Sequence, residues 1–141
     1  MDENLKKEII MEHYQTPIHR YNPNDDSYIK INTKNASCID DIDLYIKLKD
    51  NVIEDIAFSG EACAISISST SIMISNLIGK TKEEAMEIIR NFENMIDEKE
   101  YDHDLLKEAN AYDEIYKQGN RKSCAYLPYK DLKKVLEENN D

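Results

Sequence analysis

Three cysteines and one aspartate are the residues of this sequence best suited to metal chemistry. Cys38 and Asp40 lie two positions apart. Cys63 and Cys124 each precede a segment with the apolar spacing of a helix, so we expect the thiols at element ends, where distant segments can meet. Zinc accepts thiolate sulfur together with carboxylate oxygen in tetrahedral sites. If the three thiols meet, the pattern predicts a metal site with these ligands: Cys38, Asp40, Cys63 and Cys124.

The cysteine spacing by itself leaves a second interpretation open. The sequence has no Cys-x-x-Cys pair, and free cysteine is among the most buried residue types, so core packing explains isolated thiols as well as metal binding does. A centre of three thiolates, one carboxylate and Zn²⁺ would be anionic and would need a nearby cation. Arg121, three residues before Cys124, is the candidate for this electrostatic support.

Charge and composition exclude several classes of function. The 141 residues include 18 Lys and Arg against 29 Asp and Glu, which gives a net charge of −11. An acidic surface is a poor match for DNA or RNA, and no apolar run approaches the length of a membrane span. The N-terminus lacks the features of a secretory signal, and an odd cysteine count argues against a disulfide framework. We therefore expect a cytoplasmic protein with reduced thiols and with no nucleic-acid or membrane partner.

Hydrophobic periodicity predicts one α+β domain over residues 1–141. The helices are expected over 3–14, 64–78, 85–96, 104–117 and 124–138, and strands over 28–32, 42–48 and 52–58. Asp50 and Asn51 are expected to form a hairpin turn, and Thr81 with Glu84 has the pattern of a capping box. Pro128 must lie in the first turn of its helix or kink it. We expect a three-stranded antiparallel sheet, helices packed on one face and the metal site at element ends.

Five motifs along the chain resemble those of one known family. They are Met11–Pro17, Cys38–Asp40, Phe58–Ser66, Lys99–Asp102 and Arg121–Leu127. Together they resemble the U-type iron–sulfur cluster assembly proteins, the IscU/SufU/NifU N-terminal family, over nearly the whole chain. Ser123 stands where the IscU type has a histidine, and both Arg121 and the long separation of Cys63 from Cys124 resemble the zinc-binding SufU branch.

The resemblance implies a specific function. It implies zinc bound by Cys38, Asp40, Cys63 and Cys124, and a SufS-type cysteine desulfurase as partner. The chain would accept persulfide sulfur on Cys38, with Arg121 supporting the site, and pass the sulfur toward downstream cluster-assembly proteins. On this interpretation the protein is at most a zinc-dependent sulfurtransferase.

Two other functions remain open at this point. The same ligands suit a scaffold that assembles and transfers a transient [2Fe–2S] cluster, because thiolates bind both metals, and they also suit a purely structural zinc site. The chain departs from the family pattern at Ala36, where the family has proline, and at Ile39, where it has glycine. These substitutions remove no ligand, but a β-branched residue in place of glycine can alter the loop.

Two further features have structural and functional interpretations. His13 and Tyr14 suit a partner-docking surface, but a histidine at a helix end is equally well explained by the helix dipole. The serines between residues 66 and 75 suggest hydroxyls in a tightly packed helix rather than a nucleophile, because no Ser-His-acid arrangement accompanies them.

Overall fold

The computed structural model describes residues 1–34 and 40–138, so Cys38, Ala36 and Ile39 lie outside the described residues. The elements are α1 (Glu3–Gln15), β1 (Ile29–Lys34), β2 (Asp41–Lys49), β3 (Val52–Glu61), α2 (Ala64–Leu77), α3 (Lys82–Ile96), α4 (His103–Leu106), the 3-10 helices η1 (Lys107–Tyr112) and η2 (Ile115–Lys117), and α5 (Gly119–Glu138). The predicted α+β class is confirmed.

The three strands form one antiparallel sheet in the order β1-β2-β3. Alternate residues of β2, Ile42, Leu44 and Ile46, are buried, as a strand with one face on the core requires. The predicted hairpin turn between β2 and β3 is present, and both of its residues have positive φ, 52° at Asp50 and 67° at Asn51. Such φ values are typical of the type I′ turns that suit the twist of paired strands.

The strand register places the segment before β2 beside the segment after β3. Asp41 pairs with Glu61, so Asp40 lies close to the residues that lead into α2. Gly60 has a φ of +114°, and a Cβ atom there would lie 2.3 Å from the Asp41 carbonyl oxygen. Only glycine allows the two backbones to approach this closely.

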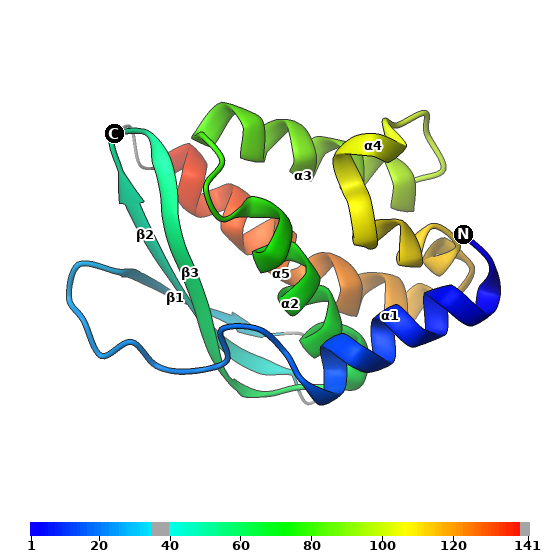
Figure 1. Cartoon of the computed structure of the whole chain (residues 1–141), viewed down its shortest axis with the longest axis horizontal. Helices are drawn as coiled ribbons and strands as arrows, with labels where there is room; N and C mark the ends of the chain where they lie inside the picture. The colour runs from blue at the N-terminus through cyan, green and yellow to red at the C-terminus, as the bar shows by residue number, and fades with distance from the viewer. Residues whose placement is uncertain (35–39, 139–141) are drawn as a thin grey trace.

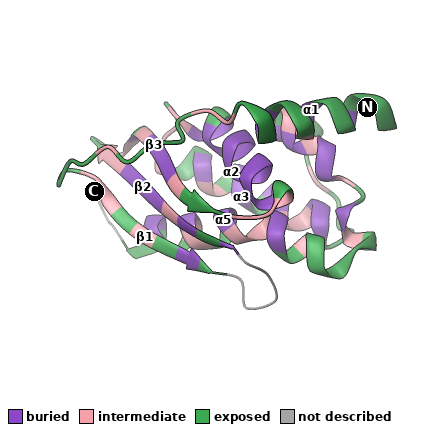
Figure 2. Cartoon of the chain, turned by 90° about the horizontal axis from the view of Figure 1, so that it is seen from below, coloured by how far each residue is buried: buried purple, intermediate pink, exposed green. Residues whose placement is uncertain are grey.

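The helices lie to one side of the sheet, and α2 packs against α1 and α5 (Figure 1). Helix α2 is buried on nearly all sides, as the mixture of isoleucine and small hydroxyl residues predicted, whereas much of α1 is exposed (Figure 2). Helix α3 begins with the predicted capping box, in which Thr81 and Glu84 exchange side-chain to backbone hydrogen bonds.

The prediction of one helix over residues 104–117 is wrong. The chain there forms α4, η1 and η2 in succession. Lys107 has a φ of 48°, which no α-helix tolerates in its interior. The Asn110 side-chain amide donates to the carbonyls of His103 and Lys107, and such local hydrogen bonds compete with regular helix.

The prediction that Cys124 opens the last helix is also wrong. Helix α5 begins at Gly119, so Cys124 lies inside it and is only 4% exposed. The backbone N–H of Lys122 already donates to the Gln118 carbonyl at 2.8 Å. Pro128 therefore lies well inside α5 and not in its first turn.

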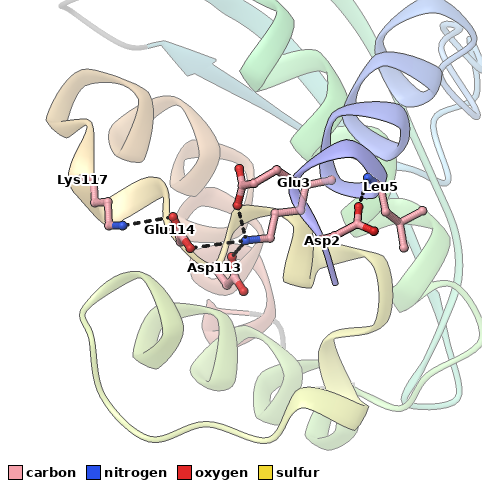
Figure 3. Close-up of polar contacts among 7 residues, drawn as sticks. Asp2, Glu3, Leu5, Asp113, Glu114 and Lys117 are labelled. Atoms are coloured by element: carbon pink, nitrogen blue, oxygen red, sulfur yellow. Dashed lines mark hydrogen bonds and ion pairs between the residues drawn. The ribbon is translucent and has the colours of Figure 1, made fainter.

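An ion-pair cluster ties the segment before α5 to α1. The Lys6 ammonium lies 2.6 Å from Asp113, 3.2 Å from Glu3 and 3.7 Å from Glu114. Figure 3 shows the side chains of Glu3, Asp113 and Glu114 lying close together. The hydrogen bond with Asp113 is the largest cause that raises the pKa of Lys6 above its ordinary value. This cluster holds the turn between η1 and η2, formed by Asp113 and Glu114, against α1.

Candidate metal centre

Asp40, Cys63 and Cys124 converge at one place in the fold. They come from the segment before β2, the residue before α2 and the interior of α5. One ligand atom from each lies within 4.8 Å of the other two. Asp40 is 3% exposed, Cys124 is buried and Cys63 is half-buried. Three of the four ligands predicted from the sequence therefore meet, and the fourth, Cys38, lies outside the described residues.

The carboxylate of Asp40 is held by the first turn of α2. The Cys63 N–H donates to Asp40 Oδ1 at 2.8 Å, and the Ser66 hydroxyl donates to Oδ2 at 2.5 Å. The Cys63 sulfur lies 3.9 Å from Oδ2. Hydrogen bonds to a carboxylate are stronger than those between neutral groups, so Asp40 is fixed beside the sulfur.

Cys63 is the N-cap residue of α2. Its backbone is extended, with φ −70° and ψ 165°, and its sulfur accepts a hydrogen bond from the Ser66 N–H at 3.5 Å. The N-terminus of a helix carries partial positive charge and stabilises anionic groups placed against it. Helix α2 thus directs its positive end at both Cys63 and Asp40.

Two serines of α2 tie the Cys124 region of α5 to this turn. The Ser66 Oγ lies 3.2 Å from the Cys124 carbonyl oxygen, and the Ser69 hydroxyl donates to the Ala125 carbonyl at 2.6 Å. These contacts fix the register of α5 against α2. They explain how a cysteine inside α5 reaches ligands that lie at the ends of other elements.

A sequence model of the NifU-like N-terminal domain matches residues 5–125. The chain belongs to this family. Zinc-dependent sulfurtransferase SufU of Bacillus subtilis is 36% identical over 131 residues, which span 92% of this chain and 88% of that protein. Iron–sulfur cluster assembly scaffold protein IscU of Thermotoga maritima is 35% identical over 114 residues, which span 81% of this chain and 80% of that protein.

Solved structures share the fold of this NifU-like domain. A crystal structure from Fervidobacterium islandicum, described as an iron–sulfur cluster assembly scaffold for the SUF system, superposes with a TM-score of 0.83 at 35% identity, over 92% of this chain and 94% of that one. An N-terminal NifU-like domain from Brucella abortus gives a TM-score of 0.83 at 17% identity, over 99% and 100% of the two chains, and this match shows the fold alone.

The donor set of this NifU-like domain fits a zinc ion. Two sulfur atoms and one carboxylate oxygen meet the preference of zinc for sulfur, nitrogen and oxygen ligands, and a tetrahedral site needs one more ligand.

Across residues 1–34 and 40–138, no helix is both long and apolar enough to cross a bilayer.

Arg121 lies one turn before Cys124 on α5 and is exposed. It lines a surface pocket of about 230 Å³ together with Ile65 from the first turn of α2. Among the described residues it makes no hydrogen bond or ion pair. Its predicted electrostatic role therefore stays a prediction, although its place beside the first turn of α2 is consistent with that role.

His13 makes structural contacts inside the fold, whereas Tyr14 is 40% exposed, and the docking role suggested for the two residues stays a prediction. His13 is 8% exposed, its Nδ1 lies 2.7 Å from the Ser71 Oγ, and its Nε2 lies 3.1 Å from Glu108. The Ser71 hydroxyl oxygen also accepts from the Ile18 N–H at 3.0 Å. These contacts join α1 and the segment after it to α2 and η1.

Ser66 is the site residue that the sequence interpretation missed. The general prediction for the serines of α2 is confirmed for Ser66, Ser68, Ser69 and Ser71, which are buried, but not for Ser75, which is exposed. Among the four buried serines, however, only Ser66 donates a hydrogen bond to Asp40. Its position three residues after a cysteine that caps a helix is the signal that could have identified it, because N-cap and N3 residues face each other.

Proposed function

We propose that this protein is a zinc-dependent acceptor of persulfide sulfur that works with a SufS-type cysteine desulfurase in iron–sulfur cluster assembly. The convergence of Asp40, Cys63 and Cys124 within 4.8 Å is the observation that carries the proposal. The identity of 36% to a zinc-dependent sulfurtransferase supports it. Zinc would be held by these three residues and Cys38, and it would keep the sulfur ligands deprotonated at neutral pH.

Cys38 is the proposed sulfur acceptor. Its thiolate attacks the outer sulfur of the cysteine persulfide on the desulfurase, as in thiol–disulfide exchange. A new S–S bond forms at Cys38 while the S–S bond of the donor breaks, and the electron pair leaves with the donor cysteine as a thiolate. Arg121 offsets the negative charge that the thiolates and Asp40 bring together. Downstream cluster-assembly proteins would then receive the sulfur.

A transient [2Fe–2S] scaffold is the second candidate function. The identity of 35% to a protein named as an IscU scaffold favours it, and two thiols with a carboxylate could also bind iron. Either function suits a single domain in the cytoplasm, where thiols stay reduced.

Sulfur transfer to a Cys38→Ser variant tests the proposal. Zinc-loaded protein is mixed with a persulfidated cysteine desulfurase, and the mass of the intact chain is measured. We expect the wild type to gain sulfur and Cys38→Ser to gain none. Ser75→Ala, which removes an exposed hydroxyl from α2, is expected to behave as wild type. Sulfur acceptance by Cys38→Ser at the wild-type level would contradict the role of Cys38.

A further inference from the structure

Ser66 lies against all three described residues of the candidate metal centre: the Asp40 carboxylate, the Cys63 sulfur and the backbone carbonyl of Cys124. Its side chain is 0% exposed, and its Oγ lies 2.5 Å from Asp40 Oδ2, 3.6 Å from Cys63 Sγ and 3.2 Å from the Cys124 carbonyl oxygen. We propose that Ser66 is the positioning residue of the centre, whose hydroxyl holds Asp40 in place and can turn to the Cys124 carbonyl when a metal ion engages the carboxylate. The inference rests on the metal site of the proposed function.

The hydroxyl of Ser66 has one proton and two acceptors within reach. A serine hydroxyl donates only one hydrogen bond at a time. The contact with Asp40, at 2.5 Å, has the length of a hydrogen bond to a charged oxygen, whereas the Cys124 carbonyl is farther away at 3.2 Å. The proton therefore lies toward Asp40 in this structure, and the carbonyl is the alternative acceptor.

Pro128 explains why this particular carbonyl suits a serine. In an α-helix the N–H of residue 128 would donate to the carbonyl of residue 124. Proline has no N–H, and Pro128 lies inside α5. The Ser66 Oγ lies 3.2 Å from the Cys124 carbonyl oxygen, the carbonyl to which an N–H at position 128 of a regular helix would donate.

This pair of acceptors matters for ligand exchange. A buried hydroxyl with no acceptor destabilises the protein. The Ser66 hydroxyl can donate to Asp40 when no metal ion is bound and to the Cys124 carbonyl when a metal ion binds the Asp40 oxygen. Asp40 can therefore gain or lose a metal ion without leaving the buried Ser66 hydroxyl unpaired. Residues that orient metal ligands typically affect metal affinity about 10–100-fold when they are removed.

Ser69 provides a matched control on the same two helices. It is also 0% exposed, and its hydroxyl donates to the Ala125 carbonyl of α5 at 2.6 Å. Ser66→Ala and Ser69→Ala therefore remove the same group from the same helix interface. Only Ser66→Ala removes a hydrogen bond to a metal ligand.

Zinc affinity measured by competition with a chromophoric chelator tests the inference on the full chain. We expect zinc binding to weaken about 10–100-fold in Ser66→Ala and to change less than about threefold in Ser69→Ala. Thermal unfolding of the metal-free variants should show similar losses of stability for both. Equal zinc affinities in the two variants, whether unchanged or equally reduced, would overturn the role of Ser66.

Ser66→Thr keeps the test decisive if Ser66→Ala does not fold. It retains the hydroxyl and adds a methyl group, so we expect a lower melting temperature but zinc binding within about threefold of wild type. Loss of zinc affinity in this variant would overturn the inference. A wild-type chain that binds no zinc would instead overturn the proposed function and the metal site with it.

Discussion

Helices α2 and α3 both pack against α5, but they do so with different chemistry. Helix α2 places hydroxyls of Ser66 and Ser69 against carbonyl oxygens of α5. Helix α3 uses an aromatic stack, in which the rings of Phe92 and Tyr129 lie 3.8 Å apart at 9°. Directional hydrogen bonds fix the position of a neighbouring helix, whereas buried aromatic area mainly adds stability. The difference indicates that α2 positions the residues of the candidate metal centre and α3 stabilises the fold around them.

The N-caps of α2 and α3 also differ in the strength of their hydrogen bonds. In α3, the Thr81 Oγ1 accepts from Glu84 N–H at 3.1 Å, and the Glu84 carboxylate accepts from Thr81 N–H at 2.9 Å. In α2, the cap is the Cys63 sulfur, 3.5 Å from the Ser66 N–H, and the first turn holds no acidic residue. Sulfur is a weak acceptor. Helix α2 thus lacks a strong cap at Cys63, a candidate metal ligand, and Asp40 supplies the missing carboxylate from another segment.

The largest expected effect comes from the aromatic contact of α3. Phe92→Ala removes a ring that is 0% exposed, so we expect the free energy of unfolding to fall by about 3–5 kcal/mol. Urea unfolding of the metal-free protein measures this loss. Zinc affinity of the folded protein should change less than about threefold, because the Phe92 ring packs on Tyr129 in the core. A loss of zinc affinity as large as that expected for Ser66→Ala would break the division between the two helices.

A smaller effect of opposite sign is expected at the cap of α2. In Cys63→Ser, an oxygen replaces a weakly accepting sulfur at the N-cap, so the metal-free variant should be more stable than wild type by up to about 1 kcal/mol. The same change should abolish zinc binding. Thermal unfolding without metal measures the gain, and Cys124→Ser is the control, because it removes a thiol inside a helix and should give no gain. A Cys63→Ser variant less stable than wild type would show that Cys63 does not weaken the cap.

Local patterns predicted most of the fold. Alternation in β2, the positive-φ pair Asp50 and Asn51, and the Thr81 capping box each depend on near neighbours in the chain, and each is confirmed. The prediction of one helix over residues 104–117 failed because the path of the chain depends on the backbone at Lys107 and on side-chain hydrogen bonds. Apolar spacing reports neither of these. Local hydrogen bonds from side chain to backbone override helix propensity in this segment.

Part of the candidate site was also predictable, because part of it depends on a local turn. The hairpin between β2 and β3 brings Asp40 and Cys63 together, so their proximity follows from a local turn and the strand register. Cys124 reaches them through the packing of α5 on α2, which spacing along the sequence cannot report, so the residues alone included it only on the condition that the three thiols meet, and the family resemblance then supported that condition. Ser66 was hidden because buried serines recur along α2 and only the folded chain distinguishes the one that contacts Asp40.

The metal and sulfide content of the protein purified without oxygen tests the central claim most directly. We expect about one zinc per chain, no acid-labile sulfide and no visible absorption. Iron with an equal amount of sulfide and a brown chromophore would contradict the zinc-dependent sulfur acceptor and would make the protein a cluster scaffold.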